Sequence, residues 1–236
     1  MIKAILFDFG QTLVNSADGF RAAEKEAQAK LFSNLGLTIQ IDFLTNYRRL
    51  RKALHEQSNF SRKFLFHEIY YYYCLTPNEK LLEQWETEYW ETVKANTLLF
   101  PEALGVLKAL NEKYLVSMIT NTQGQKTAGT HRISLFPEIE KFFKVIIVAG
   151  EDGIPAKPAP DPFRICLEKL QIKASEAVYV GDDYRIDVGG AREAGLHPIW
   201  LKHHSVKRNW PEVQISVPVI TSLEQLLDHI IPPSLK

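Results

Sequence analysis

The chain has little cysteine, no excess of charge of either sign and no long apolar run. Its two cysteines, Cys74 and Cys166, are too few for a disulfide framework and are typical of a reducing compartment. The 28 basic residues balance the 28 acidic ones, so bulk charge gives no reason to expect nucleic acid or an anionic membrane as a partner. No apolar stretch approaches the roughly 18–20 residues that span a bilayer, and we expect no signal peptide. We therefore expect a cytoplasmic protein that binds neither nucleic acid nor membrane.

Short apolar runs bounded by polar residues or glycine predict the buried strands of a parallel sheet. The runs lie at residues 2–9, 114–120, 144–149, 177–181, 198–201 and 217–220. Helical patterns lie between most of them, at residues 101–113, 123–134, 161–170, 186–194 and 223–231. Strands that alternate with helices predict an α/β fold with a doubly wound parallel sheet. A chain of 236 residues has room for one such domain and a smaller insert.

Residues 16–98 break this alternation, because they contain no convincing strand. Four helices are expected there, at residues 19–35, 41–57, 60–74 and 78–95. The residues Ser16, Asp42, Ser61 and Asn78 are plausible caps or first-turn residues of these helices. We therefore predict an α/β core of residues 1–15 and 99–236, and an inserted all-helical domain of residues 16–98.

Polar side chains follow several of the predicted strands, at the point where each strand ends. They are Asp8, Thr120 with Asn121, Lys157 in the loop after the third strand, and Asp182 followed by Asp187. The carboxyl ends of parallel strands meet at one edge of a sheet, so these side chains should lie together. Carboxylates, a hydroxyl and one ammonium suit a divalent cation and a phosphoryl group. Asp183 is expected to have a loop role or to support a metal ligand, rather than to bind the metal directly.

The string Asp8-Phe9-Gly10-Gln11-Thr12 and the clusters after it resemble, in order, the four motifs of the haloacid dehalogenase (HAD) superfamily. The resemblance implies that residues 16–98 form a helical cap over the active site. It also implies that Asp8 is the nucleophile of a phosphatase that uses Mg²⁺ and acts on a small phosphorylated metabolite. Its implied site consists of catalytic Asp8, Lys157 and Thr120, substrate-binding Thr12, Thr120, Asn121 and Lys157, and the metal ligands Asp8, Gly10 (through its carbonyl), Asp182 and Asp187.

The first motif departs from the family pattern at Gly10. Phosphatases of the family usually carry a second aspartate there, which protonates the leaving oxygen and later activates water. General acid–base catalysis contributes roughly 10²–10⁴-fold to a rate. We therefore expect low activity on alkyl phosphates and better activity on aryl or acyl phosphates, which have better leaving groups.

The sequence leaves several alternatives open. Gln11 could position a water, and the cap could supply an acid from Asp18, Glu24, His55, His67 or a tyrosine near Tyr70. The chain could instead be a 2-haloacid dehalogenase-like enzyme, although its cluster of acids is untypical of one. It could be a phosphonatase-like enzyme with a cap lysine as Schiff base, for which Lys25, Lys30, Lys52 and Lys63 are available. It could also be a weak or inactive phosphate-binding regulatory protein. The sequence gives no oligomeric state and no substrate identity.

Overall fold

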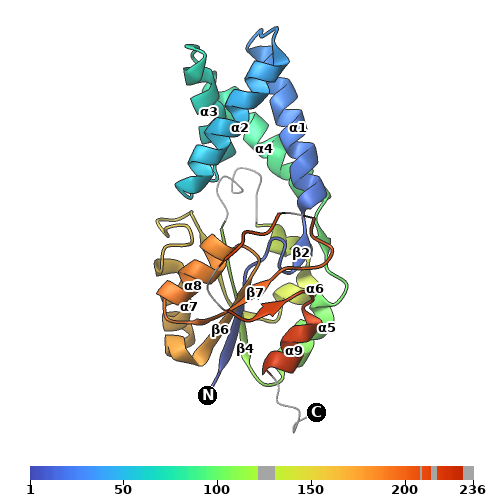
Figure 1. Ribbon diagram of the computed structural model, residues 1–236, viewed down its shortest axis with the longest axis vertical. Helices are drawn as coiled ribbons and strands as arrows, with labels where there is room; N and C mark the ends of the chain where they lie inside the picture. The colour runs from blue at the N-terminus through green and yellow to red at the C-terminus, as the bar shows by residue number, and fades with distance from the viewer. Residues whose placement is uncertain (122–130, 208, 214–216, 231–236) are drawn as a thin grey trace. The chain divides into compact units, whose positions relative to one another are not determined.

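The computed structural model describes residues 1–121, 131–207, 209–213 and 217–230, and the chain divides into two compact units (Figure 1). The core unit comprises Met1–Asn15, Leu98–Asn121 and Ile133–Lys236. The helical unit comprises Ser16–Thr97 and, among the residues placed after Asn121, His131 and Arg132.

The core unit is built on a six-stranded parallel sheet of β1 (Ala4–Phe7), β4 (Leu115–Asn121), β5 (Phe143–Ala149), β6 (Ala177–Gly181), β7 (His197–Leu201) and β8 (Val219–Ile220). The strand order in the sheet is β5-β4-β1-β6-β7-β8. Phe7 at the end of β1 is in register with Met118 of β4 and Val180 of β6. The carboxyl ends of these three central strands therefore lie side by side, which is where open α/β sheets bind ligands.

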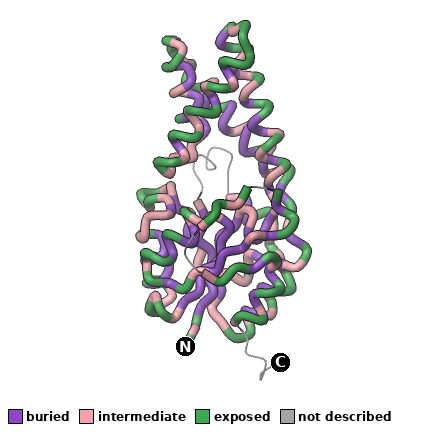
Figure 2. Tube along the Cα trace, viewed as in Figure 1, coloured by how far each residue is buried: buried purple, intermediate pink, exposed green. Residues whose placement is uncertain are grey.

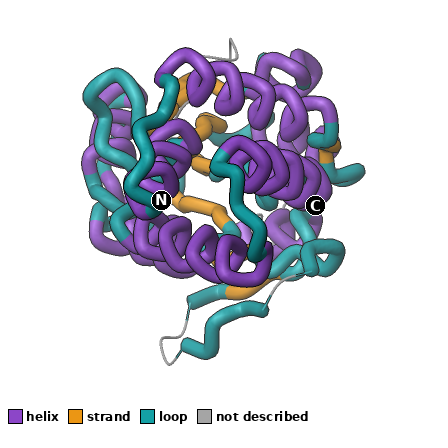
Figure 3. The backbone as a smooth tube through the Cα atoms, turned by 90° about the horizontal axis from the view of Figure 1, so that it is seen from above, coloured by secondary structure: helices purple, strands orange, loops and turns teal. Residues whose placement is uncertain are grey.

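Helices cover both faces of this sheet, as the predicted doubly wound fold requires. The helices are α5 (Ala103–Asn111), α6 (Pro137–Glu140), α7 (Asp161–Leu170), α8 (Gly190–Glu193) and α9 (Glu224–Ile230). Ile5 and Phe7 of β1 pack into one hydrophobic cluster with α5, α6 and α9, while Ala4 and Leu6 pack into another with α7 and α8. Figure 2 shows the strands as buried segments, and Figure 3 shows the same strands among helices. The structure confirms the predicted fold class.

The helical unit consists of α1 (Ala17–Asn34), α2 (Gln40–Glu56), α3 (Arg62–Tyr72) and α4 (Glu79–Ala95), and it has a hydrophobic cluster of its own. Ser61 and Asn78 cap α3 and α4 as predicted, since their side chains accept backbone N–H groups of the first turn. Ser16 makes no such cap. Its hydroxyl instead accepts a hydrogen bond from the Arg132 guanidinium at 2.6 Å.

The short strands β2 (Val14–Asn15) and β3 (Leu98–Leu99) form an antiparallel pair where the chain leaves and re-enters the core unit. Every described helix is either too short or too polar to cross a membrane.

Two predicted helices differ from the structure. Most of the predicted helix at 123–134 lies outside the described residues, and Arg132–Leu135 at its end form a short 3₁₀ helix. The predicted helix at 186–194 is a π-helical turn, Tyr184–Gly189, followed by α8. The turn is widened because the Asp183 carbonyl accepts the N–H groups of both Asp187 (2.8 Å) and Val188 (3.2 Å). A second 3₁₀ helix, Ala174–Glu176, precedes β6.

Candidate active site

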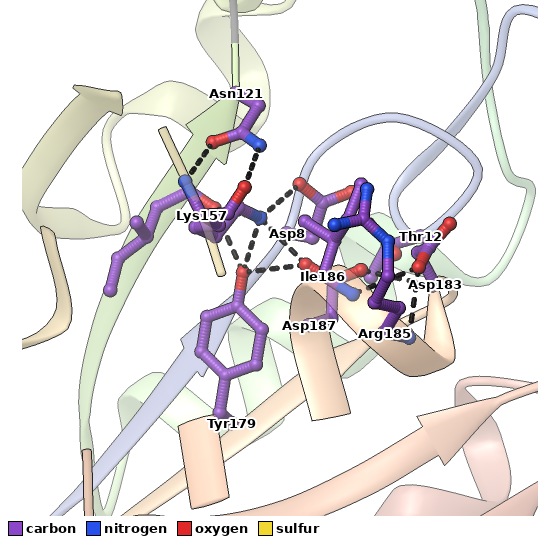
Figure 4. Close-up of polar contacts among 10 residues, drawn as sticks. Asp8, Thr12, Asn121, Lys157, Tyr179, Asp183, Arg185, Ile186 and Asp187 are labelled. Carbon is purple, nitrogen blue, oxygen red and sulfur yellow. Dashed lines mark hydrogen bonds and ion pairs between the residues drawn. The ribbon is translucent and has the colours of Figure 1, made fainter. Parts of the chain in front are cut away.

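Asp8 lies directly after β1, with its side chain buried at the carboxyl edge of the sheet (Figure 4). Its N–H donates to the Val180 carbonyl at 2.9 Å, so pairing with β6 continues one residue beyond the strand. One carboxylate oxygen accepts a bond from Lys157 Nζ at 2.8 Å, and the other lies 3.4 Å from the Thr12 hydroxyl. The sheet and these two side chains together fix the orientation of the Asp8 carboxylate.

Lys157 reaches Asp8 from the loop between β5 and α7, and both ends of the residue are held. Its backbone N–H donates to the Asn121 side chain at 2.8 Å, and its carbonyl accepts from the same amide at 2.9 Å. Its buried ammonium contacts Asp187 at 2.7 Å as well as Asp8. Burial alone would lower the pKa of Lys157, but the charges of Asp187 and Asp8 outweigh it and raise the pKa. Lys157 therefore stays charged between two carboxylates.

Tyr179 also belongs to this cluster, although the sequence did not point to it. Its hydroxyl lies 2.7 Å from Lys157 Nζ and donates to the Ile119 carbonyl at 2.9 Å. Burial raises the pKa of Tyr179 well above its usual range, and the charges of Asp187 and Asp8 add to this. Its sequence signal is one polar aromatic residue inside the otherwise aliphatic run 177–181, whereas the predicted site residues all follow strands.

Asp182 and Asp187 are brought together by the end of β6 and the π-helical turn. The Asp182 carbonyl accepts from the Trp200 indole at 2.9 Å, and the Asp187 carboxylate accepts the Asp183 N–H at 3.0 Å. A Cβ atom at Gly181 would lie 2.4 Å from the Asp187 Cβ, so only glycine allows this approach. The Asp183 side chain caps the turn by accepting two backbone N–H groups, which fits the loop role expected for it.

Three of these residues fit a divalent cation. Carboxylate oxygens of Asp8, Asp182 and Asp187 all lie within 4.8 Å of one another, and all three residues are buried. Burial raises the pKa of Asp187 to about 6, with Lys157 opposing the shift and Asp8 adding to it. One ammonium offsets only part of the charge of three carboxylates, and hard oxygen donors suit Mg²⁺.

Two further predicted residues have a defined place in the structure, and the roles predicted for them are not tested by it. Gly10 lies in an isolated bridge with Val14, and a metal-binding role for its carbonyl stays a prediction. Thr120 is buried at the end of β4, paired in register with Val148 of β5. Its phosphoryl-binding role also stays a prediction.

Glu24, weighed as a substitute acid, lies inside the helical unit in a buried polar cluster. Its carboxylate accepts from the Tyr47 hydroxyl (2.7 Å) and the Tyr89 hydroxyl (3.0 Å), and pairs with Arg62 (2.9 Å) and Arg51 (3.2 Å). Burial alone would raise the pKa of Glu24, but the two arginines outweigh it and the pKa is lowered. A carboxylate held this way is a poor proton donor.

Three further candidates for that acid also have partners within the helical unit. Asp18 forms an ion pair with Arg21, and the Tyr70 hydroxyl donates to the side chain of Asn34. His55 packs its ring against Phe60 at 5.2 Å between centroids. Tyr70 and His55 therefore have bonding or packing contacts within the helical unit, whereas the exposed pair of Asp18 with Arg21 contributes little to stability.

Comparison with known proteins adds four likenesses to this geometry. A family profile described as haloacid dehalogenase-like hydrolase matches residues 2–195. A glyceraldehyde 3-phosphate phosphatase of Pyrococcus abyssi is 30% identical over 205 residues, which are 86% of this chain and 82% of that protein. A phosphoglycolate phosphatase of Escherichia coli is 26% identical over 215 residues, with the same two shares. The crystal structure of the magnesium-bound HAD hydrolase YfnB of Bacillus subtilis is 25% identical, with a TM-score of 0.66 over 98% of this chain and 99% of that one.

Proposed function

The chain belongs to the haloacid dehalogenase-like hydrolases, and from this we propose that it is a magnesium-dependent phosphatase whose nucleophile is Asp8. The observation that carries the proposal is the pairing of Asp8 with Lys157 at 2.8 Å, beside the carboxylates of Asp182 and Asp187. This arrangement provides a nucleophile, a fixed positive charge and a set of oxygen donors at one sheet edge.

The proposed reaction has two steps. In the first, an oxygen of Asp8 attacks phosphorus, and the bond from phosphorus to the leaving oxygen breaks. In the second, water attacks the aspartyl phosphate, which releases inorganic phosphate and restores the carboxylate. Lys157 stabilises negative charge on the phosphoryl oxygens, and Thr12 and Asn121 hold Asp8 and the Lys157 loop in place. Thr120 is proposed to bind a phosphoryl oxygen.

The residues proposed to hold magnesium are Asp8, Asp182 and Asp187, with the Gly10 carbonyl. The bound ion would offset charge between the attacking carboxylate and the phosphate. The fit rests on three buried carboxylates around a single ammonium, and the magnesium-bound relative supports the choice of ion.

Gly10 sets the expected substrate preference. Glycine has no acidic side chain to protonate the leaving oxygen, so we expect that proton to come from water. Protonation by water favours leaving groups that depart as stable anions. The relatives are named for glyceraldehyde 3-phosphate and phosphoglycolate, and these small phosphorylated metabolites are the first natural substrates to test. Both are alkyl phosphates, so we expect this chain to hydrolyse them slowly and to hydrolyse aryl and acyl phosphates faster.

A leaving-group series tests the proposal. Rates would be compared for p-nitrophenyl, phenyl and alkyl phosphates, with Mg²⁺ and with a chelator. We expect rates that fall steeply as the leaving-group pKa rises, no activity with chelator, and none in Asp8→Asn. A flat dependence on the leaving group would show that another residue supplies the proton. Activity that survives chelator would exclude the magnesium-dependent mechanism.

Three competing functions have their own tests. Chelator-resistant halide release from a 2-haloacid would identify a dehalogenase, which the acidic cluster disfavours. Borohydride trapping with an aldehyde substrate would identify a phosphonatase-like Schiff base, although Lys30, Lys52 and Lys63 are engaged with glutamates. Phosphate binding without any turnover would identify a regulatory protein. We also propose a cytoplasmic location, because Cys74 and Cys166 are both free thiols.

A further inference from the structure

We propose that Tyr179 is a positioning residue whose hydroxyl aims the Lys157 ammonium at Asp8 and Asp187. The inference rests on the proposed phosphatase role of Asp8 and Lys157, and it adds a residue outside those matched to the family motifs. Tyr179 is fully buried in β6, and Figure 4 shows its hydroxyl directed at the Lys157 ammonium, beside the Asp187 carboxylate.

The hydrogen bonds around Lys157 explain why a hydroxyl is needed. The ammonium has three N–H groups but four oxygen acceptors within reach. Tyr179 and Asp187 lie at 2.7 Å, Asp8 at 2.8 Å and the Ile119 carbonyl at 2.9 Å. The Tyr179 hydroxyl reduces the competition, because it accepts from Lys157 and donates its one proton to the Ile119 carbonyl at 2.9 Å. Its other contact as a donor, to Asp187, is longer at 3.3 Å. Two N–H groups of Lys157 are then directed at the two carboxylates.

The Tyr179 hydroxyl is carried on a rigid ring of a central strand, whereas the Lys157 ammonium lies at the end of a long side chain that comes from a loop. Tyr179 lies in the sheet between Leu6 of β1 and Pro198 of β7, and its ring meets Phe163 edge-on at 5.0 Å. Lys157 comes from a loop and has a long stem whose many rotamers must be restricted. The hydrogen bond from Lys157 Nζ to the Tyr179 hydroxyl can therefore hold the ammonium in place against the central strand β6.

The variant Tyr179→Phe isolates the hydroxyl, because the ring and its packing remain. The released N–H of Lys157 should turn to the Ile119 carbonyl, which draws the ammonium off the carboxylates. We expect kcat for p-nitrophenyl phosphate to fall about tenfold with little change in KM, since a bond to a charged group is lost. The half-saturating Mg²⁺ concentration should fall about threefold, because the ammonium competes less for Asp8 and Asp187. General damage to the site would instead weaken Mg²⁺ binding.

Magnesium binding can be followed without turnover. The Trp200 indole donates to the Asp182 carbonyl at 2.9 Å, so tryptophan fluorescence should respond to Mg²⁺ alone. The matched control is Tyr114→Phe, which removes a core-unit hydroxyl that donates to the Ile230 carbonyl at 3.1 Å. That variant should change neither kcat nor the Mg²⁺ titration.

A second background tests whether Tyr179 acts through Lys157. In Lys157→Met, the further change Tyr179→Phe should leave Mg²⁺ binding unaltered. An effect that persists there would overturn the proposal. The proposal would also be overturned if Tyr179→Phe kept both kcat and Mg²⁺ affinity within about twofold of the wild type, or if it lost both. These two outcomes can be read even if Lys157→Met does not fold.

Failure of the proposed function can be told apart from failure of this inference. If the wild type hydrolyses no phosphate ester, the phosphatase proposal fails, and the Mg²⁺ titrations still decide the role of Tyr179. If the wild type also binds no Mg²⁺, the unfolding free energies of the two single variants and the double variant decide it. If the losses in unfolding free energy of Tyr179→Phe and Lys157→Met are coupled, the contact between the two side chains is supported. If the two losses simply add in the double variant, the proposal is overturned.

Discussion

Replacing Glu24 by glutamine should destabilise the helical unit far more than an ordinary surface change. The Glu24 carboxylate receives hydrogen bonds from Tyr47 and Tyr89 and ion pairs from Arg62 and Arg51. Glutamine keeps one acceptor oxygen, but its NH₂ group then faces donors. It also leaves Arg62, whose side chain is only 7% exposed, without its opposite charge.

The expected loss follows from that burial. Removing one partner of a buried ion pair costs roughly 3–5 kcal/mol. Because the Arg51 side chain is 37% exposed, its pairing adds little, so we expect Glu24→Gln to lower the free energy of unfolding by about 3 kcal/mol. The matched control is Glu88→Gln, which breaks the pair with Lys30. Both side chains there are about one-third exposed, so the loss should stay below about 1 kcal/mol.

The effect of Glu24 should also depend on pH. Its folded pKa is lowered from the ordinary 4.5, so its contribution is fully present above pH 4.5 and is lost as the pH falls through the folded pKa. The gap in stability between wild type and Glu24→Gln should therefore narrow in acid. Urea unfolding at neutral and acidic pH measures this gap.

A kinetic measurement on the same variant separates structure from catalysis. At a temperature where Glu24→Gln remains folded, its kcat for p-nitrophenyl phosphate should equal that of the wild type. The reasoning is refuted if Glu24→Gln is no less stable than Glu88→Gln. It is also refuted if the folded variant loses its activity, because Glu24 would then supply the proton that an aspartate at position 10 would otherwise supply.

Two further changes test the active site. Gly10→Asp should raise kcat for alkyl phosphates by about 10²-fold and for p-nitrophenyl phosphate by less, because an acid there can protonate the leaving oxygen. The backbone allows the substitution, since Gly10 does not have a positive φ. Equal rates for variant and wild type on alkyl esters would contradict this. Gly181→Ala should raise the half-saturating Mg²⁺ concentration at least about tenfold, because its Cβ would displace Asp187. Gly105→Ala, which meets nothing within 4 Å in α5, should leave Mg²⁺ binding unchanged, and equal titrations of the two alanine variants would refute the argument.

The sheet was predictable because burial on both faces leaves a plain signal. The run 177–181 coincides with β6, and the other strands differ from their runs by a few residues at the ends. The approach of Asp8, Lys157 and Asp187 was also foreseeable, because each follows a strand whose place in a parallel sheet is constrained.

The contacts made from within the elements were not predictable. Tyr179 lies inside a strand, and no sequence rule says that its hydroxyl meets a lysine 22 positions earlier in the chain. The π-helical turn that carries Asp187 depends on a backbone carbonyl accepting two bonds, which residue types do not specify. Glu24 similarly reads as an ordinary helix residue until the fold brings the Arg62 guanidinium to it.

The most direct test of the mechanism is the mass of the peptide that contains Asp8 after rapid acid quenching during turnover. With p-nitrophenyl phosphate and Mg²⁺, that peptide should gain the mass of one phosphoryl group, and the gain should be absent in Asp8→Asn. The account would be contradicted if inorganic phosphate were released while no phosphoryl group appeared on Asp8 at any quench time. A phosphoryl group found on another residue would equally contradict Asp8 as the nucleophile.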